Sequence, residues 1–329
     1  MKTLVVAPSW IGDAVLSHPL LVRLKEADPT GILDVLAPPW VLPVYRRMPE
    51  VTGTHTLPFG HGDLKLRERR RFAKALPRYD RAVVLPNTFK SALIPWHARI
   101  PLRTGWRGEM RYGVLNDRRV LDKAALPLIV ERYAALAQSA GEALRRPLPE
   151  PRLSVDEGAR RAAVARHGLD TSRPIAAFAP GAEYGPAKRW PARHFAALAR
   201  ELHGRGESVW LFGSSKDAEV TAGIQRLSGG VCVDLAGKTS LDEAIDLLSL
   251  AARVVSNDSG LMHVAAALDR PMAALFGSSS PEFTPPLSAR ARVITLRLAC
   301  SPCFERTCPL GHTNCLETLE PRRVLDALH

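Results

Sequence analysis

The segment RVVSNDSGLMHVAAA, residues 253–267, combines residue types that bind phosphate in α/β proteins. A β-branched stretch leads into the polar turn Asn-Asp-Ser-Gly and then into small residues that favour a helix. If that helix begins at Ser259, its first backbone N–H groups lack intrahelical partners, and the positive end of its dipole attracts an anion. Gly260 lets a ligand approach the backbone, and His263 lies one turn further along the same face. The segment therefore predicts a phosphate-binding turn.

The same turn also has a purely structural interpretation. Asp258 and Ser259 are both residue types that cap helices. The chain contains no glycine-rich fingerprint of the GxGxxG or Walker type that would decide the matter. On the turn alone, a phosphate cradle and a simple helix cap both remain open.

A second loop, FAPGAEYGPAKRWP at 178–191, again runs from a strand through glycines toward a helix. Lys188 and Arg189 stand just before that helix, where a lysine supplies a point charge to a diphosphate. The alternative is a solvated basic loop. Together with the turn at 257–260, the loop predicts a diphosphate site that needs no metal ion or other cofactor.

Asp13 follows Gly12 after the first expected strand, and its default role is to cap the helix that begins there. The functional alternative is a general base. A free aspartate has a pKa of about 3.9 and is a weak base at neutral pH. It would therefore act within a concerted transfer, helped by burial or by a neighbouring charge.

Basic residues are concentrated in the first half of the chain, and the formal net charge is +12. A run of charge is usually a solvated face, but so large a net charge also favours an acidic partner. Aromatic residues make up only 6%, and no nucleic-acid-binding motif accompanies the charge. We therefore expect an acidic, phosphorylated acceptor and no nucleic acid. The residues expected to contact this acceptor are Lys65, Arg67, Arg70, Arg107 and Arg111.

No stretch of the chain reaches the roughly 18 uninterrupted apolar residues of a membrane-spanning helix. Met1 leads directly into an expected strand instead of a signal peptide. These two observations lead us to expect a cytoplasmic protein, with room for association with a membrane surface.

The five cysteines comprise Cys232 and a group, Cys300, Cys303, Cys308 and Cys315, with the pattern C-x2-C-x4-C-x6-C. Disulfides are not expected in the compartment inferred above. Four thiols this close in sequence are able to bind zinc or an iron–sulfur cluster, but the spacings after the first pair miss the common zinc patterns. The alternative, which we adopt for the site, is a reduced loop without metal, whose small cysteines pack beside prolines.

Two halves with the same alternation of strands and helices must position these residues. A length of 329 residues and 46% hydrophobic content predict two globular domains. The expected strands are 2–7, 33–36, 81–85, 175–179, 208–212, 231–235, 253–256 and 272–276, and the expected helices are 14–26, 131–142, 156–166, 192–203, 217–227, 241–251 and 261–268. Such alternation predicts parallel sheets with helices on both faces, which bind ligands at the carboxyl ends of their strands. If the halves face each other, the turns at Asp13 and Asp258 line one cleft.

Four stretches together resemble the ADP-heptose:lipopolysaccharide heptosyltransferases of glycosyltransferase family 9. They are PSWIGDAV at 8–15, LPNTFKSALIPWHARIPLRTGWRGEMRYGVLND at 85–117, PGAEYGPAKRWP at 180–191 and SNDSGLMHVAAA at 256–267. A fifth stretch, CSPCFERTCPLGHTNCL at 300–316, resembles the type II members of the family more than the type I members. The likeness runs from about residue 1 to residue 325.

The resemblance implies a GT-B fold, in which two Rossmann-like, doubly wound parallel-sheet domains face each other across a cleft. An acceptor domain would span 1–167 and an ADP-heptose domain 168–315, and a final helix at 316–329 would be free to pack back on the first domain. The implied activity is inverting transfer of L-glycero-D-manno-heptose from ADP-heptose to the first heptose of the lipopolysaccharide inner core, Hep-Kdo-lipid A, at the cytoplasmic face of the inner membrane. The alternatives are type I transfer onto Kdo-lipid A and, in a different class, a non-catalytic protein that binds nucleotide or nucleic acid.

By motif, the resemblance makes Asp13 the base that deprotonates the acceptor hydroxyl and Lys188 the cation that holds the donor diphosphate. The expected remainder of the donor cradle is Asp258, Ser259, Gly260 and His263. Fixed N–H donors and a lysine would stabilise the negative charge that develops on the departing ADP. After the expected strand at 208–212, no residue clearly matches the acidic group that binds the adenosine ribose in this family. The resemblance implies neither a cofactor nor a metal ion in the site.

Overall fold

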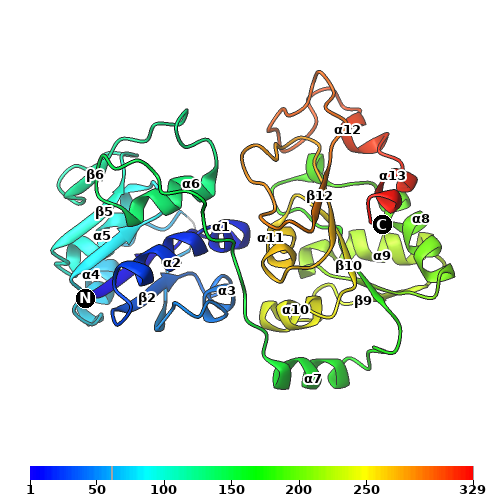
Figure 1. The fold of residues 1–329 in the computed structure, drawn as a ribbon, viewed down its shortest axis with the longest axis horizontal. Helices are drawn as coiled ribbons and strands as arrows, with labels where there is room; N and C mark the ends of the chain where they lie inside the picture. The colour runs from blue at the N-terminus through cyan, green and yellow to red at the C-terminus, as the bar shows by residue number, and fades with distance from the viewer. Residues whose placement is uncertain (61, 329) are drawn as a thin grey trace. The chain divides into compact units, whose positions relative to one another are not determined.

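A computed structural model describes residues 1–60 and 62–328, which form two compact units, Met1–Pro151 and Arg152–His329 (Figure 1). Each unit contains a six-stranded sheet whose neighbouring strands are parallel and which carries helices against it. The predicted fold class, two Rossmann-like doubly wound sheets of the GT-B type, is confirmed. Among the described residues, none of the helices is both long enough and apolar enough to cross a bilayer.

The first sheet has the strand order β3-β2-β1-β4-β5-β6. Its strands are β1 (Lys2–Val6), β2 (Ile32–Ala37), β3 (Gly53–Thr56), β4 (Arg81–Val84), β5 (Leu102–Trp106) and β6 (Asp117–Arg119). Because β1 pairs with both β2 and β4, the winding of the chain reverses between β1 and β4. Loops diverge at such a reversal, and doubly wound sheets bind ligands there, beyond the carboxyl ends of the strands.

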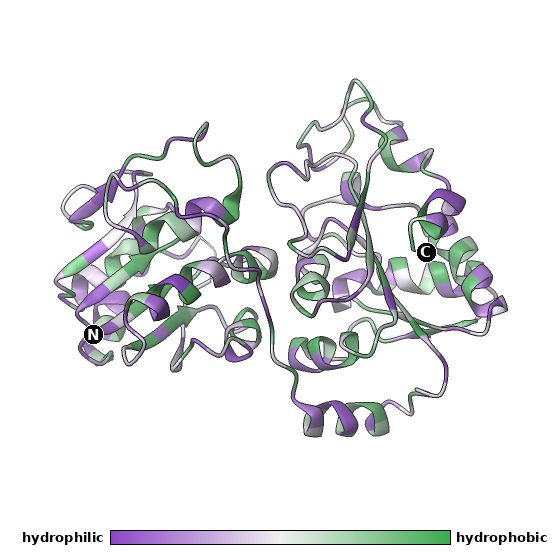
Figure 2. Cartoon of the chain, in the orientation of Figure 1, coloured by the Kyte–Doolittle hydropathy of each residue, from purple (hydrophilic) through white to green (hydrophobic). Residues whose placement is uncertain are grey.

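The helices of the first unit are α1 (Ile11–Leu16), α2 (His18–Ala27), α3 (Leu42–Arg46), α4 (Leu66–Ala75), α5 (Phe89–His97) and α6 (Ile129–Ala134), followed by the 3₁₀ turn η1 (Ala135–Ala137). On one face of the sheet, Leu4 and Val84 pack with Leu93 and Ile94 of α5 in a buried cluster. The helices carry both hydrophobic and hydrophilic residues (Figure 2), as expected of elements with one buried side.

Several sequence predictions for this unit were wrong in detail. The helix expected at 14–26 is two helices, because Ser17 ends α1 and Pro19, which lacks an N–H, lies in the first turn of α2. The helix expected at 131–142 ends early, since the backbone is already extended at Gln138. Residues 66–75, for which no helix was expected, form α4.

The second sheet has the order β12-β11-β10-β7-β8-β9, which is the same winding pattern when counted from β7. Its strands are β7 (Ile175–Ala179), β8 (Ser208–Leu211), β9 (Cys232–Asp234), β10 (Arg253–Asn257), β11 (Met272–Leu275) and β12 (Ala291–Ile294). The reversal falls between β7 and β10, which pair directly. Every residue of β7 is buried, because the sequence Ile-Ala-Ala-Phe-Ala has no polar side chain to turn toward water.

The helices of the second unit are α7 (Glu157–Arg166), α8 (Ala192–Gly204), α9 (Ala218–Leu227), α10 (Leu241–Leu248), α11 (Gly260–Ala267), α12 (Asn314–Glu317) and α13 (Pro321–Asp326), with 3₁₀ turns η2 (Pro186–Lys188) and η3 (Ser215–Asp217). Helix α10 begins with a capping box: Ser240 Oγ accepts from the Glu243 N–H, and the Glu243 carboxylate accepts from the Ser240 N–H.

The boundary between the units lies at 151/152 and not at the predicted 167/168. Helix α7 belongs to the second unit because it packs against α10. At its start, the Asp156 N–H donates to Asp246 Oδ1 over 3.0 Å, and near its end Arg166 forms an ion pair with Glu243. Helix α7 ends at Arg166, with His167 as its C-cap residue, and this end separates α7 from β7 within one unit.

The C-terminal segment also belongs to the second unit. Val324 and Leu325 of α13 are buried in one cluster with Leu198 and Leu202 of α8. The resemblance allowed residues 316–329 to pack on the first domain. The apolar face of α13 is buried in the second unit instead. His329 lies outside the described residues.

Candidate functional site

The winding reversal of the second sheet is flanked by two loops, 180–191 after β7 and 258–259 after β10. The fully buried Asn257, the last residue of β10, joins them. Its Oδ1 accepts a hydrogen bond from the Trp190 N–H over 3.0 Å, and its Nδ2 donates to the Pro180 carbonyl over 2.6 Å. Sequence reasoning included Asn257 in the turn but gave it no role. The sequence signal for such a role is an amide side chain that directly follows the short Val-Val-Ser run of a buried strand.

Lys188 and Asp258, both predicted from the sequence, meet at this edge of the sheet. Lys188 Nζ lies 2.6 Å from Asp258 Oδ2, and the two side chains are 17% and 5% exposed. The ammonium also lies 5.0 Å from the centre of the Tyr184 ring. An ammonium group has three N–H donors. One is used by Asp258, so the others can bind an anion placed at the mouth of the loop.

Helix α11 begins at Gly260, with Ser259 as its N-cap residue. The Ser259 side chain makes no capping hydrogen bond in the described structure; its Oγ lies 3.3 Å from Ser256 Oγ. The neighbouring Asp258 carboxylate is paired with Lys188. The interpretation of this turn as a simple helix cap therefore does not hold. The positive end of the helix lies beside the lysine instead, which is a favourable setting for a diphosphate.

His263 lies one turn into α11 and is 4% exposed. Burial, opposed by the charge of Asp258 and assisted by that of Lys188, lowers the pKa of His263 to about 4. The imidazole is therefore neutral at pH 7. Its Nδ1 has no hydrogen-bond partner among the described atoms.

Asp217 is the first acidic residue after β8, on the other side of β7. Its carboxylate accepts hydrogen bonds from the N–H and the hydroxyl of Ser214. A Cβ atom on Gly181 would lie 2.3 Å from Asp217 Oδ1, so only glycine allows this approach. Asp217 thus lies against the loop after β7, at the position where the sequence gave no clear match for a ribose-binding acid.

Asp13 lies in the first unit, after β1 and next to the reversal of the first sheet. It is the third residue of α1, whose N-cap is Trp10, so the prediction that Asp13 caps the helix was wrong. Asp13 is partly buried and interacts with Tyr133 of α6 through a hydrogen bond and through its charge. The carboxylate is therefore held in place by its neighbours.

Two buried phenols surround this carboxylate. Burial, and after it the charge of Asp13, hold the pKa of Tyr133 well above its usual value. Burial also raises the pKa of Tyr45, whose hydroxyl lies 3.0 Å from Ser17 Oγ. Both phenols keep their protons at neutral pH, so Tyr133 is the donor in its hydrogen bond with Asp13. This orients the Asp13 carboxylate without neutralising it.

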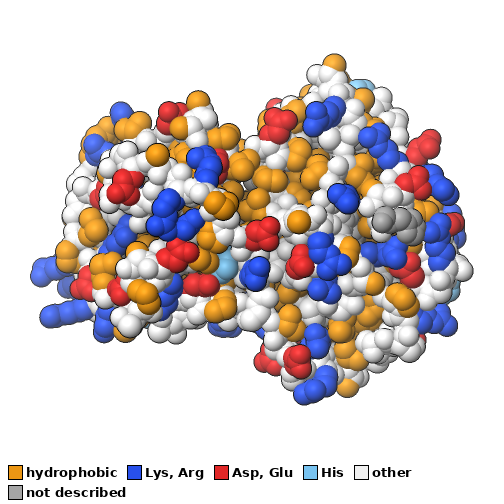
Figure 3. Space-filling view, in the orientation of Figure 1, with side chains coloured by type: hydrophobic (Ala, Val, Ile, Leu, Met, Phe, Trp, Pro, Cys, Tyr) orange, Lys and Arg blue, Asp and Glu red, His pale blue; other side chains and the backbone are white. Residues whose placement is uncertain are grey.

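Four of the five predicted acceptor contacts, Lys65, Arg67, Arg70 and Arg107, are exposed. Lys and Arg side chains form scattered groups among polar and hydrophobic surface in Figure 3. Lys65 pairs with Asp63 over 2.9 Å at the start of α4. Between the exposed arginines, Arg69 turns inward and lies 4.3 Å from the centre of the Phe59 ring. Arg69 thus anchors α4 and leaves its neighbours available to a ligand.

The fifth predicted contact, Arg111, is fully buried. Its guanidinium donates to the Pro86 carbonyl over 2.7 Å, to Asn87 Oδ1 over 3.2 Å and to the Trp106 carbonyl. Burial lowers its pKa to about 10, so it stays charged at neutral pH. Arg111 therefore joins the loops after β4 and β5. The prediction that it contacts the acceptor directly was wrong, because its side chain is buried.

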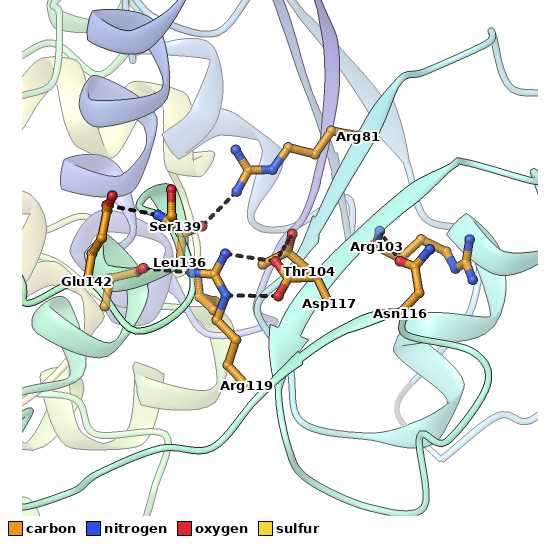
Figure 4. Close-up of polar contacts among 10 residues, drawn as sticks. Arg81, Arg103, Thr104, Asn116, Asp117, Arg119, Leu136, Ser139 and Glu142 are labelled. Carbon is orange, nitrogen blue, oxygen red and sulfur yellow. Dashed lines mark hydrogen bonds and ion pairs between the residues drawn. The ribbon is translucent and has the colours of Figure 1, made fainter.

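Other arginines of the first unit also serve the fold (Figure 4). Arg119 on β6 pairs with Asp117 over 2.7 Å and donates to the Ala135 carbonyl, and Arg81 donates to the Leu136 carbonyl. Arg103 donates to the Ile100 and Val114 carbonyls. Much of the positive charge of this unit is therefore directed at backbone oxygens, and only part of it is available to an acidic ligand.

Two doubly wound sheets, one with a lysine and a helix N-terminus suited to a diphosphate and the other with an oriented carboxylate, define a GT-B glycosyltransferase. The family model for glycosyltransferase family 9 (heptosyltransferase) matches residues 69–314. The chain belongs to this family. It is therefore an enzyme, and the alternative of a non-catalytic binding protein is set aside.

Relatives within the family resemble the chain over its whole length. Lipopolysaccharide heptosyltransferase 2 of Salmonella typhimurium is 51% identical over 100% of this chain and 98% of its own. The solved structure of Escherichia coli ADP-heptose lipopolysaccharide heptosyltransferase II superposes with a TM-score of 0.90 at 48% identity, covering 100% of this chain and 97% of that one. Lipopolysaccharide heptosyltransferase 1 of Pseudomonas aeruginosa is 29% identical over 100% of this chain and 97% of its own.

His263 gives a pH-dependent prediction. Because its pKa of about 4 in the folded chain lies below the value of about 6.5 in an unfolded chain, the unfolded state takes up the proton first as the pH falls. Its contribution to the free energy of unfolding is complete above about pH 6.5 and declines toward pH 4. In NMR, we expect its ring resonances not to titrate between about pH 5.5 and 8.

The His263 resonance is assigned by its disappearance in His263→Gln, which should also remove this part of the pH dependence of unfolding. A His263 resonance that titrates near pH 6.5 would mean that the ring is hydrated and not buried as described.

Proposed function

We propose that the chain transfers L-glycero-D-manno-heptose from ADP-heptose to the first heptose of the lipopolysaccharide inner core, Hep-Kdo-lipid A, with inversion at the anomeric carbon. One observation carries this proposal: full-length identity is 51% with a type 2 enzyme and 29% with a type 1 enzyme. Type I transfer onto Kdo-lipid A is the alternative that the same family allows.

The donor side of the proposal rests on the second unit. Lys188 and the backbone N–H groups at Gly260 bind the diphosphate and stabilise the charge that develops on ADP as it departs. Asp258 holds Lys188 in position, and Ser259 supplies a hydroxyl beside the helix N-terminus. The neutral His263 supports the cradle from within α11 without adding a charge. Asp217, next to Gly181, is the candidate for the ribose hydroxyls.

The acceptor side rests on the first unit. Asp13 takes the proton of the attacking hydroxyl while the acceptor oxygen bonds to the anomeric carbon and the bond from that carbon to the ADP oxygen breaks. Attack on the face opposite the leaving group inverts the configuration. Tyr133 keeps Asp13 oriented for this step. A base of low intrinsic strength suffices, because proton transfer accompanies bond formation and does not precede it.

The acidic acceptor meets the exposed cations Lys65, Arg67, Arg70 and Arg107. Because this acceptor is built on lipid A, the enzyme works at the cytoplasmic face of the inner membrane as a peripheral protein. Exposed apolar side chains accompany the cations, with Leu64 and Leu66 48% and 49% exposed at the start of α4. Such a combination favours an anionic, amphiphilic partner.

The test is transfer from ADP-heptose to Hep-Kdo-lipid A and to Kdo-lipid A in parallel reactions with purified protein. We expect turnover with the first acceptor and little with the second, and a product whose anomeric configuration is opposite to that of the donor. Preferential turnover with Kdo-lipid A would establish type I activity. Failure with both acceptors would refute the proposed function.

Asp13→Asn removes the base but keeps the size of the side chain and its contact with Tyr133. We expect kcat to fall by at least about 100-fold, the usual scale for a general base, while the affinity for ADP stays unchanged. Isothermal titration calorimetry separates the two effects. Asp122→Asn, which alters an exposed carboxylate of the same unit, is the matched control. Turnover of Asp13→Asn close to the wild-type value would exclude Asp13 as the base.

Lys188→Ala removes the cation of the diphosphate site. Since a hydrogen bond to a charged group contributes about 1.5 kcal/mol or more, we expect Kd for ADP and KM for ADP-heptose to rise at least about tenfold. Lys123→Ala, an exposed lysine of the other unit, should leave both values unchanged. Unaltered ADP binding by Lys188→Ala would remove this lysine from the donor site.

A further inference from the structure

The segment between β12 and α12, residues 295–313, has little regular structure in its described form. It buries few apolar side chains, and Phe304 and Leu310 are 51% and 59% exposed. Ordering each residue of such a segment costs about 1–2 kcal/mol of conformational free energy, which burial of apolar surface does not offset here. Interactions other than apolar burial, among them hydrogen bonds to Ser278 and Gly277, therefore hold the segment in place.

Three cysteines of this segment converge in space with Cys315 of α12. A cavity of about 20 Å³ is lined by all four of them together with His312, although the first and last are fifteen positions apart in the chain. A cavity of this size holds about one small sphere such as a water molecule. Thiols are weak hydrogen-bond partners for a water molecule, whereas thiolates are strong ligands for zinc and iron(II). The lining residues in question are Cys300, Cys303, Cys308 and Cys315.

The thiol of Cys308 is held by the backbone around it. Backbone N–H groups of the four residues 310–313 hydrogen-bond to its sulfur. These contacts keep Cys308 at the wall of the cavity that the other three cysteines also line.

All five cysteines are free thiols. In their present rotamers, no three His, Cys, Asp or Glu side chains of residues 1–60 and 62–328 surround a single metal position. Ligation therefore requires the thiols that line the cavity to turn inward. The exposure of Cys300 leaves its side chain room for this rotation.

We propose that Cys300, Cys303, Cys308 and Cys315 together bind one thiophilic transition-metal ion, zinc or iron(II), which fixes the segment 295–313. A set of four sulfur ligands is the tetrahedral donor set that these two ions favour. His312 also lines the cavity but is not one of the proposed ligands. Its Nδ1 accepts a hydrogen bond from the Asn314 N–H.

The metal ion would stabilise the loop that carries Lys188. The Ala187 N–H donates to the Arg306 carbonyl over 3.1 Å, and the Tyr184 hydroxyl donates to the Phe304 carbonyl over 2.6 Å. A Cβ atom on Gly185 would lie 2.4 Å from the Arg306 carbonyl oxygen, so the two segments are in close contact. This consequence rests on the proposed donor site, whereas the metal content of the protein does not.

The first experiment measures zinc and iron by mass spectrometry in protein purified under reducing conditions without chelators or metal-affinity resin. We expect about one equivalent of metal per chain, and the element found distinguishes the two ions. After the metal is removed, added Co²⁺ should produce the charge-transfer and visible absorption of tetrahedral thiolate coordination. These readouts do not depend on activity, so they hold even if no sugar is transferred.

The paired variant Cys303→Ser with Cys308→Ser should lose the metal and the Co²⁺ spectrum, while Cys232→Ala, which removes the cysteine outside the segment, should keep both. Far-UV circular dichroism verifies that each variant folds, and the wild-type measurements decide the question if the paired variant does not. Less than about 0.1 equivalents of metal, with no uptake of micromolar Zn²⁺ by the reduced wild type, would overturn the proposal.

Retention of the metal by the folded paired variant would overturn the proposal equally.

A second experiment measures the binding of ADP with and without the metal. We expect ADP to bind more weakly once the metal is removed. A metal-loaded protein that does not bind ADP at all would contradict the proposed function while leaving the metal site established.

Discussion

The donor side of this enzyme depends on one buried amide. Asn257 ends the buried part of β10, and its two hydrogen bonds hold the loop after β7 against the start of α11. Without this contact, Lys188 and the helix N-terminus would lie on separate, independently moving loops. The ion pair between Lys188 and Asp258 then sets the distance between them. A buried amide suits this task because a charged group in its place would be costly to bury, whereas an amide both donates and accepts.

The second unit was more predictable from sequence than the first, for a physical reason. Its central strands are buried on both faces, so they appear as short apolar runs such as residues 175–179, separated by helices of clear periodicity. In the first unit, β5 and β6 carry Arg103, Asp117 and Arg119, which pair with each other or with backbone oxygens at the edge of the sheet. Because of these charged residues, β5 and β6 were not recognised as strands in the sequence. The partners that allow charged residues in these strands are known only from the tertiary structure.

The candidate site shows the same limit. The types and spacing of Lys188, Asp258 and Gly260 were sufficient to predict a diphosphate-binding edge, because helix N-termini after parallel strands have a fixed chemistry. The role of Arg111 was not predictable, since an arginine in a basic stretch has the same sequence signature whether it faces a ligand or three carbonyl and amide oxygens. The surroundings of Asp13 were equally hidden: Tyr45 and Tyr133 are about 30 and 120 positions away in the sequence.

The burial of α13 in the second unit has a consequence for how the protein is made. The first sheet is built from one uninterrupted stretch of chain, so it can close while the rest is still being synthesised. The second sheet cannot be completed in that way. Its core includes Leu319, Val324 and Leu325, and Trp190 Nε1 donates to the Leu319 carbonyl. Synthesis must therefore proceed beyond Leu325 before this core can close, and a chain truncated before Leu319 would expose a hydrophobic face to chaperones and proteases.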